Sequence, residues 1–211
     1  MAKIDLIELR QIIGREEFDY PLLTSALSPY LAVDQKINEL LKSGAVVRVK
    51  KGLYVFGSKT QQKAICQESL ANLIYGPSCI SMEYALSYHG LIPERVETIT
   101  SVTPKKNKEF NTPVGRFTYR HLSPAKYPHG IGQIWIDQQH PILMATPEKA
   151  LCDYVVLRNV PEITSPKAAK DFLMSDLRID LEDWSRLDVR KLLRLNKAYN
   201  SRTIACILEV L

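Results

Sequence analysis

The chain has 211 residues, of which 45% are hydrophobic, enough for one large domain or two small ones with ordinary packed cores. No apolar run approaches the roughly 18 residues that span a bilayer, and the N-terminus lacks a signal-peptide pattern. We therefore expect a globular, cytoplasmic protein. Its cysteines lie far apart without a C-x-x-C pair, which predicts buried reduced thiols instead of a zinc site or disulfides.

The net charge of +5 is unevenly distributed along the chain. Residues 36–63 hold seven basic residues against a single acidic one, Glu39, and residues 95–126 hold seven against two. The rest of the chain therefore carries a net negative charge. This distribution is typical of a polyanion-binding surface on an acidic body, although solvated charge runs give the same pattern.

In chain order, the first predicted elements are three short helices. Isoleucines and leucines at helical spacing predict a helix over residues 3–13, which Gly14 ends. A second apolar segment covers residues 20–27, after a polar break. Ser28 and Pro29 then match an N-cap followed by proline at the first helical position. A third helix of about 14 residues should start there.

The third predicted helix is amphipathic, and Gly44 follows it. Its expected inward residues are Tyr30, Val33, Ile37, Leu40 and Leu41, and its expected outward residues are Gln35, Lys36, Asn38, Glu39 and Lys42. Residues 45–49 and 53–56 are β-prone and flank the sequence Lys50-Lys51-Gly52, which predicts a hairpin with a basic tip. Three helices followed by this hairpin predict a winged helix-turn-helix domain over residues 1–60.

A winged helix places its third helix in the major groove of DNA. Gln35 and Asn38 would then contact base edges, Lys36 would reach guanine or phosphate, and the hairpin would grip the backbone or minor groove. The predicted DNA-binding residues are Gln35, Lys36, Asn38, Lys42, Arg48, Lys50, Lys51 and Gly52. Winged helices also serve as protein-interaction modules, and Glu39 would repel phosphate, so a module without DNA binding is the alternative.

Residues 61–211 predict a larger α+β domain with a helical C-terminus. Thr146-Pro147 and Ser165-Pro166 repeat the N-cap and proline pattern and start two of its helices. The expected helices are 62–75, 81–89, 148–157, 167–173 and two pieces of 181–211 broken near Asn200, and the expected strands are 96–102, 115–122 and 132–136.

This larger region shows no pattern of catalytic chemistry. It has no glycine-rich phosphate loop, its histidines stand singly, and Ser78 and Ser81 lack nucleophile-elbow glycines. We interpret Glu148-Lys149 as the start of a helix, where the helix dipole stabilises the negative charge of the glutamate. We therefore expect no enzyme activity, metal or cofactor. Lys105, Lys106 and Lys108 form a possible second basic patch for DNA or a partner, with a solvated hairpin tip as the alternative.

Three segments resemble the AbiEi family, which comprises antitoxins of type IV toxin-antitoxin systems and transcriptional regulators of viral-defence loci. They are R-V-K-K-G-L-Y-V-F at residues 48–56, Y-G-P-S-C-I-S-M-E-Y-A-L-S-Y-H-G-L-I-P-E at residues 75–94, and A-T-P-E-K-A-L-C-D-Y at residues 145–154. The resemblance spans residues 1 to about 160. One departure is the presence of Asp34 and Glu39 in the third helix, which makes its DNA face less basic.

The resemblance implies that the N-terminal domain represses its own operon by binding promoter repeats. It also implies that the C-terminal domain, residues 61–211, counteracts a nucleotidyltransferase-like toxin and is not itself an enzyme. For single residues, the resemblance implies that Lys50, Lys51, Gly52 and the outward face of the third helix contact DNA. A nuclease or nucleotidyltransferase is a third hypothesis, which would need clustered acidic residues and a divalent metal.

Overall fold

The computed structural model describes residues 5–211, which form two compact units. Unit 1 contains the described residues up to Ile74 together with Asn111–Gly115, and unit 2 contains Tyr75–Phe110 and Arg116–Leu211. Unit 1 thus extends beyond residue 60, where the sequence pattern placed the boundary. Both units mix helices and strands, which confirms the α+β class.

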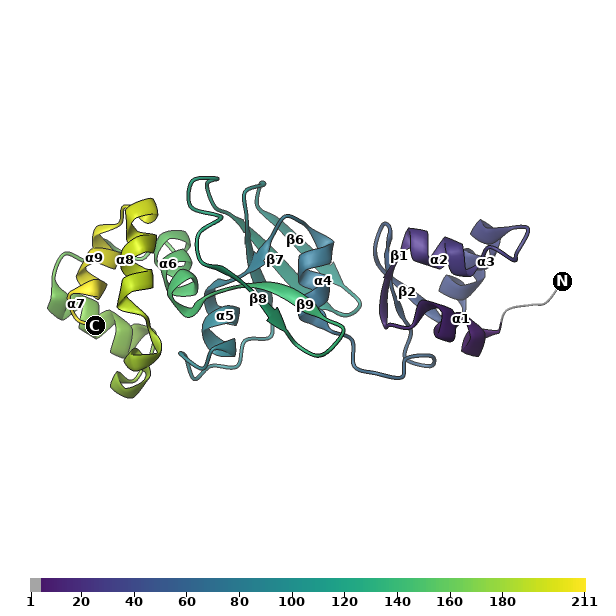
Figure 1. Cartoon of the computed structure of the whole chain (residues 1–211), viewed down its shortest axis with the longest axis horizontal. Coiled ribbons are helices and arrows are strands. Elements are labelled where there is room, and N and C mark those ends of the chain that lie inside the picture. The colour runs from purple at the N-terminus through teal and green to yellow at the C-terminus, as the bar shows by residue number, and fades with distance from the viewer. Residues whose placement is uncertain (1–4) are drawn as a thin grey trace. The chain divides into compact units, whose positions relative to one another are not determined.

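Unit 1 consists of short helices beside a small antiparallel sheet (Figure 1). Among the described residues, the strand order in this sheet is β1-β3-β2. Its elements are α1 (Leu6–Ile13), β1 (Glu17–Asp19), α2 (Tyr20–Ala26), α3 (Val33–Lys42), β2 (Val46–Lys50), β3 (Leu53–Phe56) and α4 (Gln67–Ile74).

The first and third helices are shorter than the sequence predicted. Asp5 caps α1 by accepting a hydrogen bond from the backbone N–H of Glu8, and residues 3–4 of the expected helix lie outside the described residues. The expectation that α3 starts at Ser28-Pro29 was wrong, because α3 begins at Val33. The backbone N–H groups of Ser28 and Tyr30 bond to the carbonyls of Ser25 and Leu27, which makes this segment a turn.

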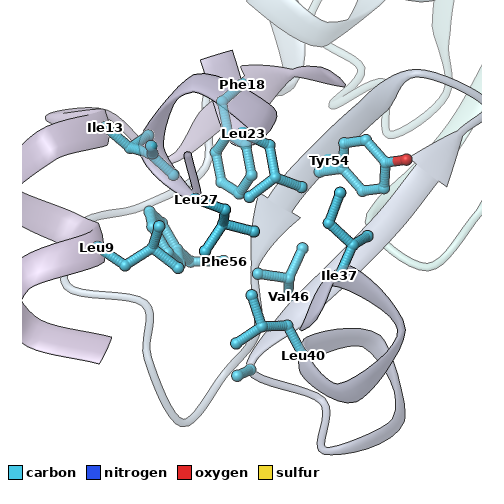
Figure 2. Packing of buried hydrophobic residues seen from close by; sticks show 12 residues of the cluster. Leu9, Ile13, Phe18, Leu23, Leu27, Ile37, Leu40, Val46, Tyr54 and Phe56 are labelled. Carbon is cyan, nitrogen blue, oxygen red and sulfur yellow. The ribbon is translucent and has the colours of Figure 1, made fainter. Parts of the chain in front are cut away.

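The core of unit 1 is one apolar cluster between its helices and its sheet. Figure 2 shows Leu9 and Ile13 from α1, Leu23 from α2 and Ile37 and Leu40 from α3 meeting strand residues. The strand residues that it labels are Phe18, Val46, Tyr54 and Phe56. Tyr30, Val33 and Leu41 pack against this cluster while only partly buried. The predicted inward face of the third helix is therefore confirmed.

The predicted polar break before α2 instead contains β1 and two buried glutamates. Glu16 receives two hydrogen bonds from the Arg10 guanidinium, at 2.6 and 3.2 Å, and others from the backbone N–H groups of Gln62 and Lys63. Glu17 accepts a hydrogen bond from the backbone N–H of Cys66. These hydrogen bonds hold residues 62–66 in a non-helical conformation, and α4 begins at Gln67 and not at the predicted Gln62.

Unit 2 is built on a mixed sheet with the strand order β6-β7-β5-β4-β9-β8 among the described residues. β4 pairs antiparallel with β5 and parallel with β9, whereas β5 and β7 run parallel. The strands are β4 (Cys79–Ile80), β5 (Ile99–Thr103), β6 (Lys108–Thr112), β7 (Gly115–His121), β8 (Ile131–Trp135) and β9 (Pro141–Ala145). The sequence patterns did not predict β4, which is very short, β9, or β6, which is mostly polar.

The α-helices described in unit 2 are α5 (Met82–Tyr88), α6 (Pro147–Leu157), α7 (Pro166–Asp171), α8 (Val189–Tyr199) and α9 (Arg202–Leu208), and the segments Phe172–Asp176 and Leu181–Arg186 form a π-helix and a 3-10 helix. α5 packs on β5, β9 and α6, and α6 in turn packs on α8 and α9. Thr146 and Ser165 cap α6 and α7 as the sequence predicted, and Asn200 separates the two terminal helices in a left-handed conformation. The cysteines are free and buried.

No helix within residues 5–211 has both the length and the apolar character to cross a membrane.

Candidate nucleic-acid interface

The α3 helix presents a polar face to solvent because its other face is anchored in the core. Ile37 and Leu40 are only 5% and 6% exposed. Gln35, Asn38 and Lys42 are all exposed, and their spacing of three and four residues aligns them along one side of the helix. A row of amide and ammonium groups on a firmly anchored helix can donate hydrogen bonds to a ligand surface.

Lys36 is less available than the sequence predicted. Its ammonium lies 3.4 Å from the Glu39 carboxylate and 5.2 Å from the centre of the Tyr30 ring. The side chain is 28% exposed, whereas that of its partner Glu39 is 55% exposed. Because an exposed pair at this distance is weak, Lys36 can still turn toward an anion, but it does so against a neighbouring negative charge.

The basic hairpin is confirmed, with Gly52 in the left-handed conformation (φ 83°) that its turn requires. Arg48 and Lys51 are exposed. Lys50 differs from them, because its ammonium donates to the carbonyl oxygens of Leu73 and Ile74 at the C-terminal end of α4. These contacts favour a structural role for Lys50, so Arg48 and Lys51 are the stronger candidates for a ligand contact.

Lys105, Lys106 and Lys108 lie in unit 2, whereas the other predicted site residues lie in unit 1. They occupy the turn after β5 and the first position of β6. All are exposed, so the basic character predicted for this turn is present at the surface of unit 2.

A group of buried polar side chains in unit 2 was not predicted from the sequence. The Asp153 carboxylate accepts hydrogen bonds from the hydroxyls of Ser81 and Tyr199, the former at 2.6 Å. The Lys149 ammonium lies 3.3 Å from the same carboxylate and donates to the Tyr199 hydroxyl at 3.0 Å. Ser81, Lys149 and Asp153 are completely buried, and Tyr199 is 2% exposed.

This buried network connects two of the segments noted in the sequence. Ser81 lies in residues 75–94, whereas Lys149 and Asp153 lie in residues 145–154 and Tyr199 lies at the end of α8. Burial raises the pKa of Asp153, while Lys149, Ser81 and Tyr199 oppose this by stabilising its ionised form. Because these side chains are buried and bonded to one another, the network links α6 to α8 and to Ser81, the residue before α5. In the sequence, the four-residue spacing of Lys149 and Asp153 could have indicated this ion pair, because residues at that spacing are neighbours on a helix.

Glu148 was interpreted as a dipole-favoured residue, and the structure adds a specific contact. Its carboxylate, 1% exposed, accepts a hydrogen bond at 2.9 Å from the backbone N–H of Asp188, which caps α8. Both polar residues at the start of α6 therefore have partners in the C-terminal helices. These contacts with Asp188 and Tyr199 explain why Glu148 and Lys149 are buried.

Within residues 5–211, no group of three or more histidine, cysteine, aspartate or glutamate side chains is placed to hold a metal ion. The exposed polar residues of α3 and the hairpin form the main candidate interface. Comparisons of the sequence with models of protein families and with curated proteins found no match.

Proposed function

We propose that unit 1 is a winged helix-turn-helix that binds duplex DNA upstream of its own gene and represses transcription. The observation that carries this proposal is the alignment of Gln35, Asn38 and Lys42 on the exposed side of α3 while Ile37 and Leu40 fix the helix in the core. A helix held in this way can enter a major groove without losing its position. The element order of unit 1 and the exposed hairpin cations support the same proposal.

In this proposal the two exposed elements have different tasks. Gln35 and Asn38 carry amides, which can form paired hydrogen bonds with the edge of adenine. Arg48 and Lys51 carry charges and contact phosphates, which set the register of the protein on DNA but do not read its sequence. The lower positive charge on α3, where Glu39 partly neutralises Lys36, makes these hairpin contacts more important for affinity.

We further propose that unit 2 acts as the antitoxin half of the protein and opposes a nucleotidyltransferase-like toxin. This part of the proposal rests on the resemblance of residues 75–94 and 145–154 to AbiEi proteins. Its test is co-expression of the chain with the toxin from a neighbouring gene. Rescue of growth by the full chain supports the proposal, whereas unchanged toxicity at equal expression contradicts it.

The test of DNA binding is a titration of the protein against labelled duplex from upstream of its gene and against a scrambled duplex, each at two salt concentrations. We expect tighter binding to the upstream duplex and a steep loss of affinity with salt, with a slope of about −0.9 for each phosphate contacted. Arg48→Ala with Lys51→Ala should weaken binding to both duplexes. The absence of binding at either salt concentration would instead favour a protein-interaction module.

A further inference from the structure

The two edges of the unit 2 sheet differ in the residues that they present to solvent. Among the described residues, this sheet ends in β6 on one side and in β8 on the other. β6 contains Lys108 and Glu109, both exposed, and charges on an edge strand discourage pairing with another chain. β8 has the sequence Ile-Gly-Gln-Ile-Trp. The β8 edge therefore lacks the charged and proline residues that commonly protect an edge strand.

The backbone groups of β8 alternate between β9 and the open edge of the sheet. Just after β8, the backbone N–H of Ile136 donates to the carbonyl oxygen of His140. Just before β8, the carbonyl oxygen of Gly130 accepts a hydrogen bond from the backbone N–H of Thr146. Since successive residues of an antiparallel pair direct their backbone groups toward the partner and away from it in turn, the odd-numbered residues of β8 direct theirs away from β9. These are the groups that a further strand can bond.

An exposed apolar patch lies beside this open edge. Trp135, which is 59% exposed, lies opposite Pro141 of β9. Leu143, which is 41% exposed, lies opposite Gln133. Because paired residues share a face of the sheet, as do residues two apart along a strand, these side chains lie on one face. An exposed tryptophan with apolar neighbours is typical of a protein–protein contact.

Two copies of β8 are complementary when they pair antiparallel about Gln133. In this register Gln133 lies opposite its own counterpart, and Trp135 lies opposite Ile131 of the second copy. The whole strand is then paired, and the backbone groups of its odd-numbered residues all find partners. Because the arrangement has two-fold symmetry, the contact between tryptophan and isoleucine is made twice.

The residues that flank β8 are complementary in the same register. Asp137 follows the strand and His129 precedes it, so the pairing brings Asp137 to the end at which His129 of the second copy lies. The Asp137 carboxylate lies 2.8 Å from Nδ1 of His140 in its own chain, but the side chain is 55% exposed and a carboxylate accepts several hydrogen bonds. The exposed His129 imidazole can therefore donate to it. These matches at both ends favour a second copy over a strand of an unrelated protein.

We propose that the protein forms a two-fold dimer in which β8 pairs antiparallel with β8 of a second copy and Trp135 packs against Ile131 of that copy. The pairing joins the two sheets into one and covers both open edges. The edges that remain are the two β6 strands, whose charges discourage further pairing, so assembly stops at the dimer. This inference goes beyond the proposed function and does not depend on it, because the contact involves neither DNA nor a toxin.

The first test measures the oligomeric state of the full chain by sedimentation velocity over a range of protein concentrations. We expect a dimer that dissociates on dilution. Gln133→Pro removes the N–H at the centre of the pairing but keeps the hydrogen bonds to β9, because position 133 faces the open edge. Since both copies lose this donor, the dissociation constant should rise roughly 30-fold. Gln133→Thr keeps the N–H and is the matched control, which should dimerise like the original chain.

Two outcomes of this measurement would overturn the proposal. One is an original chain that stays monomeric at every concentration, which would leave the β8 edge for a strand of a different protein. The other is a dimer that Gln133→Pro and Gln133→Thr affect equally, which would place the contact elsewhere on the chain.

A cross-linking experiment tests the register directly and does not require the proline variant to fold. The cysteines of the chain are buried, so a cysteine introduced at an exposed position is the main target of a short bis-maleimide. Gln133→Cys should give covalent dimers, because this position lies opposite its own counterpart in the proposed register. Gln138→Cys, also exposed but beyond the end of β8, lies far from its counterpart and should stay monomeric. Equal cross-linking at the two positions, or none at position 133, would overturn the proposal.

Discussion

Lys42 in unit 1 and Lys149 in unit 2 are both helical lysines close to a glutamate in the sequence, yet their surroundings are opposite. Lys42 is exposed on the polar side of α3, whereas Lys149 is completely buried beside Asp153. The difference arises from elements distant in the sequence, because Tyr199 of α8 covers the Lys149 ammonium. The same residue type in a helix is therefore exposed to solvent in unit 1 and used to hold α6 against α8 in unit 2.

The comparison is tested most strongly by Lys149→Met. Removal of the ammonium leaves the buried Asp153 carboxylate without its counter-ion, so we expect unit 2 to lose about 3–5 kcal/mol of its free energy of unfolding. Both tryptophans, Trp135 and Trp184, lie in unit 2, so their fluorescence in a urea titration reports this unit. Lys167→Met is the matched control and should change stability little. A loss below about 1 kcal/mol would show that the network does not hold unit 2 together.

The corresponding change in unit 1 is Glu16→Ala. It leaves the Arg10 guanidinium and the backbone N–H groups of Gln62 and Lys63 without their acceptor, and we expect a loss of about 3 kcal/mol in the stability of unit 1. Amide resonances of unit 1 followed by NMR in a urea series measure this loss, and tryptophan fluorescence should show that unit 2 is unaffected. Equal destabilisation of both units would contradict their separate description.

Glu16 also predicts a smaller, pH-dependent effect. Burial by itself would raise the pKa of Glu16, but hydrogen bonds from Arg10 and from the backbone of Lys63 and Gln62 lower it below its usual value. Because the folded-state pKa lies below the unfolded one, the stabilisation is complete above about pH 4.3 and is lost as the pH falls through the folded-state pKa. Urea titrations of the original chain and of Glu16→Gln should converge at low pH. A constant difference between them would rule out this linkage.

Lys50 and Lys51 allow the same comparison, between a lysine with structural contacts and an exposed lysine, at two neighbouring positions of the hairpin. Lys50→Ala removes hydrogen bonds to the end of α4 and should cost unit 1 about 1 kcal/mol. Lys51→Ala should change stability by less than about 0.5 kcal/mol but weaken DNA binding, because its side chain is exposed. Thermal unfolding and DNA titration of both variants measure these effects. The reverse assignment of the two effects would contradict our interpretation of the hairpin.

Sequence patterns located the local features of both units, because these depend on neighbouring residues. The amphipathic face of α3, the Gly52 turn and the caps Thr146 and Ser165 were all predicted correctly. The predicted start of α3 was wrong, because Ser28 and Pro29 also suit a turn and local propensity cannot decide between the two.

Sequence patterns could not predict contacts between residues that are far apart in the chain. Glu16 and Glu17 looked like part of a polar break, but they are buried because their backbone partners lie about 50 residues later. The strand β6 was missed since its residues are mostly polar, and the buried network around Lys149 joins residues from three separate segments, namely Ser81, α6 and α8. The exposed site residues were easier to predict, because exposure on a helix follows directly from its periodicity.

The central claim, that α3 reads DNA, is tested most directly by the ratio of affinities for the upstream duplex and a scrambled duplex. This ratio is measured for the original chain and for Gln35→Ala with Asn38→Ala. A paired base contact provides roughly 1–3 kcal/mol of discrimination. We expect the substitutions to reduce the free-energy difference between the two duplexes by this amount, while affinity for scrambled DNA stays constant. A preference for upstream DNA that survives both substitutions unchanged would contradict the assignment of α3 as the recognition helix.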